Sequence, residues 1–154
     1  MSRLPYELDP EERPLPSAAR VLIVDPDVRF GLLLKGYLES RGWTVDWVED
    51  GRLALQEWET YRPDLLIAEL QGKDLDGFEL LETLGRLPTP PAVVVCTRLA
   101  GVQGWTDGTF RELGVRAVLV RPVRFPEVAR TLEEVMAQIT STLPSISAIV
   151  TKAV

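Results

Sequence analysis

The chain has 154 residues, a formal net charge of −6 and an apolar content of 45%, which fits one folded domain with its own core. The negative charge argues against nonspecific binding of nucleic acid or anionic membranes, because both need a basic face. There is no histidine and only one cysteine, Cys96. Ser-His-Asp and Cys-His catalysis, His-ligated metal sites and an internal disulfide are therefore excluded.

The sequence has no apolar signal segment at its start and no apolar stretch long enough to span a bilayer. A single cysteine is typical of a reducing compartment. We therefore expect a cytoplasmic protein that binds neither membranes nor nucleic acid.

Short β-branched apolar runs alternate with segments that carry apolar residues at helical spacing. A Pro-rich acidic arm over residues 1–19 comes first and is expected to be solvated. In chain order, the pattern then predicts a strand over 19–25, a helix over 26–42, a strand over 43–50, a helix over 51–62, a strand over 64–70, a helix over 77–87, a strand over 91–97, a weak helix over 102–114, a strand over 116–121 and a helix over 125–140.

Five strands alternating with five helical segments predict an α/β fold over residues 20–140, in which helices cover both faces of a parallel sheet in three layers. Residues 141–154 fall outside this alternation and form a β-prone tail. Two alternatives stay open for the tail. It is either disordered, or it pairs with a sheet edge in the same chain or in a partner chain.

Polar residues follow the predicted strands at the edge where open α/β sheets bind ligands. The first strand is followed by Asp25, Pro26 and Asp27, the third by Glu69, the fourth by Thr97, and the fifth by Arg121 and Pro122.

The stretches "VLIVDPD", "RPDLLIAEL…DLDGFELL", "VVVCT" and "VLVRPV" resemble the receiver domain of two-component response regulators over roughly residues 19–140. The resemblance implies a CheY-like, flavodoxin-like fold with sheet order 2-1-3-4-5. It also implies an acidic pair that holds Mg²⁺, an aspartate phosphorylated by a histidine kinase, a Thr or Ser, a Lys, and an X-Pro bond that is often cis.

The sequence departs from the family's pattern at the positions that carry the phosphorylation chemistry. Asp25 matches the first acid and Thr97 the hydroxyl residue, but the second acid falls on Pro26, Glu69 replaces the phosphoacceptor and Arg121 replaces the Lys. Loss of a carboxylate ligand makes Mg²⁺ binding weak or absent, so we expect no cofactor. A longer nucleophile and a planar guanidinium also disfavour phosphoryl transfer. We therefore expect a degenerate phosphoacceptor site without catalysis.

Further expectations concern single residues. Glu69 and Arg121 should lie close, as a direct pair or through Thr97. Two interpretations of Glu69 stay open: a mimic of the phosphorylated aspartate, or a structural partner of Arg121. Asp25 or Asp27 should cap the following helix, the Thr97 hydroxyl should cap local amides, and Cys96 should be a core residue.

These expectations describe an atypical response regulator, or pseudo-receiver, in a bacterial two-component or phosphorelay pathway. It would act as a phosphorylation-independent protein–protein interaction module. No DNA-binding or catalytic segment is found in these residues, so output is expected through a protein partner or self-association. The expected surface comprises 102–114, 116–121 and 125–140, with Trp105 and Val118 as possible interface residues.

Two alternatives remain. A working receiver would use Glu69 or the nearby Asp74 or Asp76 as phosphoacceptor. A small-ligand sensor would bind a nucleotide or another anion through three arginines, which are Arg98, Arg116 and Arg121.

Overall fold

The computed structural model describes residues 19–72, 77–99, 108–140 and 150–152. Its elements in chain order are β1 (Arg20–Val24), α1 (Val28–Ser40), β2 (Thr44–Val48), α2 (Gly51–Gln56), α3 (Trp58–Tyr61), β3 (Leu65–Ala68), α4 (Gly77–Gly85), β4 (Ala92–Thr97), α5 (Gly108–Glu112), β5 (Val115–Val120), α6 (Phe125–Thr140) and β6 (Val150–Lys152).

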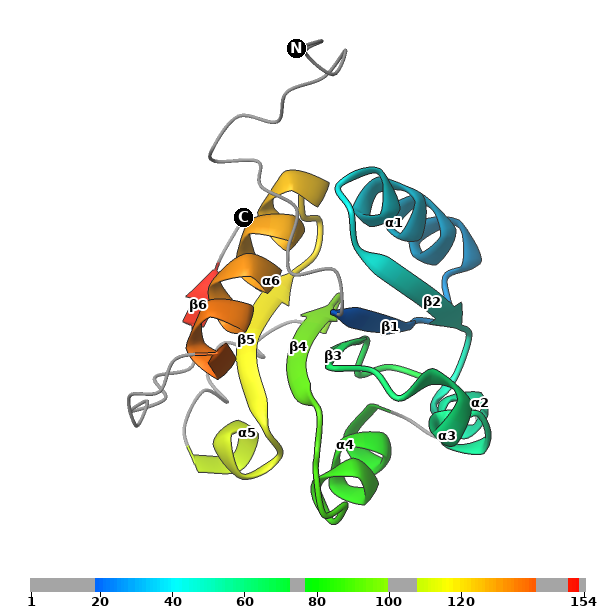
Figure 1. Ribbon diagram of the computed structural model, residues 1–154, viewed down its shortest axis with the longest axis vertical. Coiled ribbons are helices and arrows are strands. Elements are labelled where there is room, and N and C mark those ends of the chain that lie inside the picture. The colour runs from blue at the N-terminus through cyan, green and yellow to red at the C-terminus, as the bar shows by residue number, and fades with distance from the viewer. Residues whose placement is uncertain (1–18, 73–76, 100–107, 141–149, 153–154) are drawn as a thin grey trace, which may run out of the picture.

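All strand pairs are parallel, and the order across the sheet is β2-β1-β3-β4-β5-β6 (Figure 1). The predicted five-stranded sheet with order 2-1-3-4-5 is confirmed. A sixth strand, β6, comes from the tail that lies outside the predicted alternation. Of the two alternatives for the tail, the structure shows residues 150–152 paired to the sheet edge in the same chain.

Buried side chains of β1 to β5 alternate between two cores, one on each face of the sheet. In β1, Val21 and Ile23 face the core covered by α1 and α6, whereas Leu22 and Val24 face the core covered by α2, α4 and α5. Because both faces are buried, β1, β3 and β4 are nearly continuous apolar runs rather than alternating patterns. This two-sided burial leaves the carboxyl ends of the strands as the place where polar side chains gather.

Two helices begin at aspartate caps. The Asp27 side chain accepts a hydrogen bond from the Phe30 amide at 3.1 Å and starts α1, and the Asp50 side chain accepts from the Leu53 amide at 2.9 Å and starts α2. Asp27 therefore fills the cap that was expected of Asp25 or Asp27.

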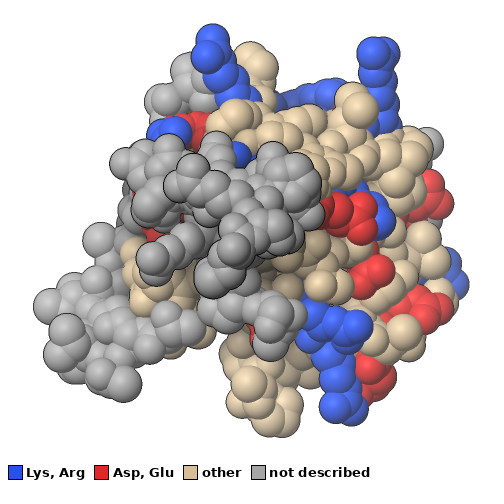
Figure 2. Space-filling model, turned by 45° about the horizontal axis from the view of Figure 1, so that its top comes forward, with Lys and Arg blue, Asp and Glu red and all other residues tan. Residues whose placement is uncertain are grey.

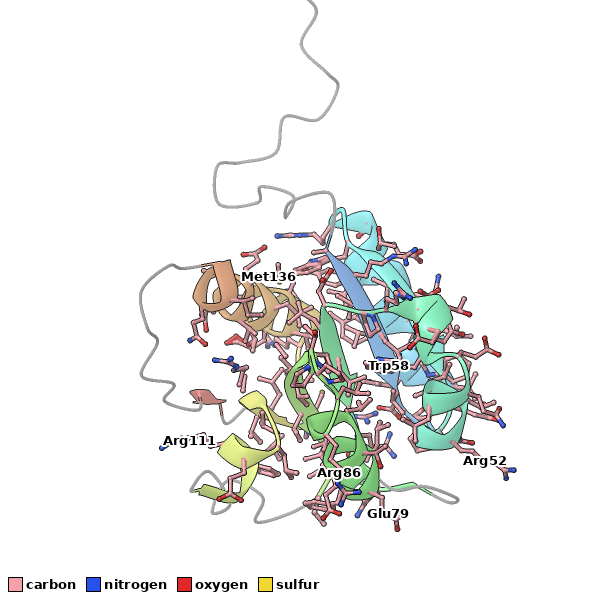
Figure 3. The ribbon with its side chains drawn as sticks, turned by 60° about the horizontal axis from the view of Figure 1, so that its bottom comes forward. Arg52, Trp58, Glu79, Arg86, Arg111 and Met136 are labelled. Carbon is pink, nitrogen blue, oxygen red and sulfur yellow. The ribbon has the colours of Figure 1, made fainter. Side chains whose placement is uncertain are left out.

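The predicted helix over 51–62 is wrong in one respect, because it is interrupted at Glu57 and forms α2 and α3. Trp58, at the start of α3, packs against the core between this helix and the sheet (Figure 3). The fourth and fifth predicted helices consequently carry the labels α5 and α6. Of the predicted helix over 102–114, the structure describes residues 108–114, and α5 ends at Glu112.

On the face shown in Figure 2, Lys and Arg side chains are scattered among acidic and uncharged ones. No helix in the described part of the chain is both long and apolar enough to cross a membrane.

Two glycines of α1 provide a matched pair of substitutions. Gly31 is buried, and a Cβ added there would overlap the indole of Trp47, whereas a Cβ on Gly36 would meet nothing within 4 Å. Gly31→Ala is expected to lower the free energy of unfolding by about 1–3 kcal/mol through overpacking. Gly36→Ala, in the same helix, should raise it by about 0.5–1 kcal/mol, because alanine has the higher helix propensity.

Urea denaturation followed by tryptophan fluorescence measures both changes. A Gly31→Ala variant as stable as the unmodified chain would show that the indole can move without cost, and would contradict the packing described here.

Candidate functional site

Four strands bring polar residues to one place at the carboxyl edge of the sheet. Asp25 follows β1, Glu69 follows β3, Thr97 ends β4, and Arg121 follows β5. Backbone hydrogen bonds extend the ladders to these positions, from the Glu69 amide to the Val24 carbonyl at 3.0 Å and from the Arg121 amide to the Thr97 carbonyl at 2.8 Å. The predicted site residues therefore converge, except for Pro26, whose exposed ring carries no polar group.

The guanidinium of Arg121 lies among three carboxylates. Its Nη1 is 2.8 Å from Asp25 Oδ2 and 3.8 Å from Glu69 Oε1, and its Nη2 is 3.6 Å from Asp27 Oδ2. The side chains of Arg121, Asp25 and Glu69 are only 5%, 3% and 3% exposed. Water therefore screens this cluster little, and each charge depends on the others for compensation.

An aromatic ring completes the surroundings of the cation. The Arg121 guanidinium carbon lies 3.5 Å from the centroid of the Phe30 ring, a cation–π contact. Phe30 in turn packs edge-on against Phe125 of α6, with 5.8 Å between ring centroids. The cation is thus held between the acidic strand ends and an aromatic pair that joins α1 to α6.

Asp25 is positioned from several sides. Its Oδ1 accepts a hydrogen bond from the Asp27 amide at 2.8 Å, and its carbonyl accepts one from the Trp47 indole at 3.0 Å. Burial raises the pKa of Asp25 above its ordinary value, while the Asp27 amide and Arg121 oppose this rise. Asp25, rather than Glu69, is the nearest carboxylate to Arg121, so the expected Glu69–Arg121 pair is the longer of the two contacts.

Glu69 and Thr97 each bind local backbone amides. Glu69 Oε2 accepts from the Leu70 amide at 2.7 Å, and Oε1 accepts from the Arg98 amide at 3.1 Å. The Thr97 hydroxyl accepts from the Leu99 amide at 3.0 Å, which is the capping contact expected of it. Glu69 meets Arg121 directly, not through this hydroxyl.

The residues present do not fit Mg²⁺. This ion prefers octahedral oxygen ligation with one or two carboxylates and several waters. Here Pro26 provides no ligand, and the carboxylates of Asp25 and Glu69 already face the Arg121 guanidinium. Within the described ranges, no group of three acidic, histidine or cysteine side chains is arranged to hold a metal ion. No step of the chemistry is therefore assigned to a metal.

Asp27 links the cluster to the surface. It forms ion pairs with Arg121 and with Arg98, whose side chain is 59% exposed. The hydrogen bond from the Phe30 amide, followed by the charges of Arg98 and Arg121, lowers the pKa of Asp27. Asp27 therefore stays ionised and bridges a buried cation and an exposed one.

The anion site of three arginines is not formed. Arg98 and Arg121 lie at the carboxyl edge of the sheet. Arg116, near the start of β5, lines a groove of about 460 Å³ at the opposite end of the strands, together with Pro63 and Met136. The prediction was wrong because residues 116 and 121 are separated by almost the full length of a strand.

The possible interface residues have different outcomes. Val118 is 0% exposed in the middle of β5, so its side chain cannot serve as a surface contact, and that prediction was wrong. Its position within an apolar run already indicated burial on both faces. Trp105 and the alternative phosphoacceptors Asp74 and Asp76 lie outside the described residues.

Cys96 is a core residue, as expected. It is 1% exposed, and burial raises the pKa of its thiol to about 12. It therefore stays protonated and unreactive near neutral pH. The Arg121–Pro122 bond is cis, as the resemblance implied.

Two residues that contact the site were not predicted, namely Phe30, whose ring lies over Arg121, and Trp47, whose indole donates a hydrogen bond to the Asp25 carbonyl. A signal existed for Phe30, because it stands three residues after the capping Asp27 and so lies in the first turn of α1, beside the site. No comparable local signal pointed to Trp47.

Together, the fold and the site define a parallel α/β domain in which an arginine lies among the acidic side chains at the carboxyl edge of the sheet. The family model for the response regulator receiver domain matches residues 21–133. The chain belongs to this family, and is a receiver domain of the two-component response-regulator type.

Several relatives are similar over most of this chain. The transcriptional activator protein IrlR of Burkholderia pseudomallei is 32% identical over 117 residues, which are 76% of this chain and 50% of IrlR. The autoinducer 2 sensor kinase/phosphatase LuxQ of Vibrio cholerae is 29% identical over 132 residues, which are 84% of this chain and 15% of LuxQ. The chain thus spans half or less of the length of these two relatives.

Solved structures share the fold. A sensor protein from Polaromonas sp. JS666 superimposes with a TM-score of 0.72 at 23% identity, covering 80% of this chain and 99% of that one. A two-component response regulator from Clostridium difficile gives a TM-score of 0.71 at 22% identity, with the same coverage. At these identities the likeness supports the fold alone.

Proposed function

We propose that this protein is an atypical, phosphorylation-independent receiver that acts as a protein–protein interaction module in cytoplasmic two-component-type signalling. One observation carries the proposal: the buried Arg121 guanidinium lies among the carboxylates of Asp25, Asp27 and Glu69, where a working site needs a metal ion and a free nucleophile. The protein would then be a signalling module rather than an enzyme.

The charge arrangement supports this proposal. Phosphoryl transfer depends on positioning and on metal neutralisation of the phosphoryl charge. Asp25 is occupied by Arg121 and the Asp27 amide, and both oxygens of Glu69 accept backbone hydrogen bonds. The extra methylene of a glutamate moves the nucleophile by about 1 Å, and a misplacement of that size can cost about 100-fold in rate.

Of the two interpretations of Glu69, these contacts favour the structural one. Glu69 satisfies the amides of Leu70 and Arg98 and shares Arg121 with Asp25. The charges of such a site are already compensated without a phosphoryl group, so the conformation of the domain would not depend on a kinase. Output would then be governed by the availability of a protein partner, at the surface formed by α5, β5 and α6.

Incubation with acetyl phosphate and Mg²⁺, followed by intact-mass spectrometry, tests the proposal. The unmodified chain is expected to gain no phosphoryl group. The matched control is the triple variant Pro26→Asp, Glu69→Asp and Arg121→Lys, which restores the residue types of the family and is expected to gain one.

A phosphoryl group on the unmodified chain would contradict the proposal. Peptide mapping would then distinguish the two versions of the working-receiver alternative, in which either Glu69 or one of Asp74 and Asp76 is the acceptor.

A further inference from the structure

The outer edge of β5 is occupied by the chain's own C-terminal segment. Residues Ala117, Val118 and Leu119 pair in parallel register with Val150, Thr151 and Lys152. Figure 1 shows β6 beside β5, at the end of the sheet opposite β2. The three β5 residues are completely buried.

Without β6, this edge would be open. β5 would then be the last strand, and a last strand presents a row of unpaired backbone N–H and C=O groups. The helices do not replace this pairing, because α5 and α6 pack against β5 with side chains. In Figure 3, β6 lies between α6, marked by Met136, and α5, marked by Arg111.

The cap formed by β6 is small. It pairs three residues of β5, which has six, whereas β4 pairs with β5 at five positions. Fewer backbone hydrogen bonds hold β6 than hold the inner strands, so β6 is the strand that leaves the sheet most easily. It is also very short, and a very short edge strand is a common protection against further strand addition.

We propose that the outer edge of β5 is a strand-pairing surface that β6 keeps closed, and that its partner, once β6 has left, is the same edge of a second copy of the chain. A two-fold axis would make the two β5 strands antiparallel. With the axis at Val118, Val118 faces its own copy, Ala117 faces Leu119 and Arg116 faces Val120. No like charges then lie opposite each other, so the edge is complementary to itself.

This inference is independent of the phosphosite. It needs only the β5–β6 pairing and the uncharged stretch over residues 117–120. It names a self-association surface on the part of the molecule where partner binding was expected, and it makes the C-terminal segment the competitor of that association.

Two variants of the full chain open the edge. One lacks residues 150–154, and the other is Lys152→Pro, because in this register the amide of residue 152 faces β5 and proline has no N–H for the ladder. Sedimentation equilibrium over a range of concentrations is expected to show dimers of both variants at concentrations where the unmodified chain is a monomer. The matched control, Thr151→Pro, removes an N–H that faces away from β5 and should leave the association state unchanged.

Hydrogen exchange provides a second measurement. In the dimeric variants the amides of Val118 and Val120, which face away from β4, should stay protected, because the second copy replaces β6. In the unmodified chain the β6 amides should exchange faster than those of β4, and this result is available even if a variant does not fold.

Three results would overturn the proposal. An unchanged association state of both folded variants would mean that the open edge does not attract a second copy. A lower association state would mean that β6 is exchanged between copies and holds them together. Equal protection of β6 and β4 in the unmodified chain would mean that the cap does not open separately from the sheet.

Discussion

Arg121→Met is expected to lower the free energy of unfolding by about 3–5 kcal/mol near neutral pH, because removal of one partner leaves buried charge uncompensated. Methionine keeps much of the apolar length of the arginine side chain but none of its charge. Asp25 and Glu69, whose side chains are each 3% exposed, would then face each other without a cation.

The matched control for this prediction is Arg98→Met. Arg98 also pairs with a carboxylate of the site, Asp27, but its side chain is 59% exposed. Exposed pairs contribute about 0–1 kcal/mol, so the control should lose little stability. Urea denaturation of both variants measures the difference. Equal losses would show that burial of the Arg121 cluster does not govern its energetics.

The stability deficit of Arg121→Met should depend on pH in a defined direction. In the folded chain the pKa of Asp25 already lies above its ordinary value of 3.8, first because of burial. A carboxyl group with a raised folded pKa contributes stability below its unfolded pKa, and this contribution is lost as the pH rises through the folded pKa. Loss of Arg121 removes one of the interactions that oppose the rise.

The deficit of the variant should therefore shrink as the pH falls below the folded pKa of Asp25, where the carboxyl is neutral and no longer needs the cation. Denaturation midpoints compared at acidic and neutral pH check this sign. A deficit that grows on acidification would contradict the assignment of the effect to Asp25.

Phe110→Ala is expected to lower the free energy of unfolding by about 3–5 kcal/mol through the lost apolar contacts and the cavity left behind. Phe110 is completely buried and stacks on Phe78 of α4, with 6.4 Å between ring centroids and 10° between ring planes. α5 has five residues, which is too few for a helix to be stable on its own. The buried ring therefore anchors this helix to the sheet.

Phe110→Leu is the control, because it keeps most of the apolar volume and should lose less than the alanine variant. Denaturation followed by circular dichroism measures both. Equal losses of stability in the two variants would show that replacement of the aromatic ring by any smaller side chain releases α5 completely. A loss below about 1 kcal/mol for the alanine variant would mean that the site collapses and that α5 does not depend on this anchor.

Much of the fold and part of the site could be predicted from the sequence. Apolar runs and helical spacing located ten elements, because strand and helix periods depend on residues a few positions apart. The cap of α1 could be predicted for the same reason, because an aspartate stands directly before the helix. The positions of the strand ends predicted the site residues Asp25, Glu69, Thr97 and Arg121, because the carboxyl ends of parallel strands lie at one edge of the sheet.

Only the tertiary structure decided how those residues pair. That Arg121 lies nearer Asp25 than Glu69, and under the Phe30 ring, depends on the relative placement of side chains from different strands and from α1. Likewise, the sequence left open whether the β-prone tail pairs with the sheet, and β6 becomes a strand because the edge of β5 offers it hydrogen-bond partners. The sequence by itself determined which chemical groups lie at the site, whereas the packing of distant segments determined that the arginine pairs with the carboxylates there.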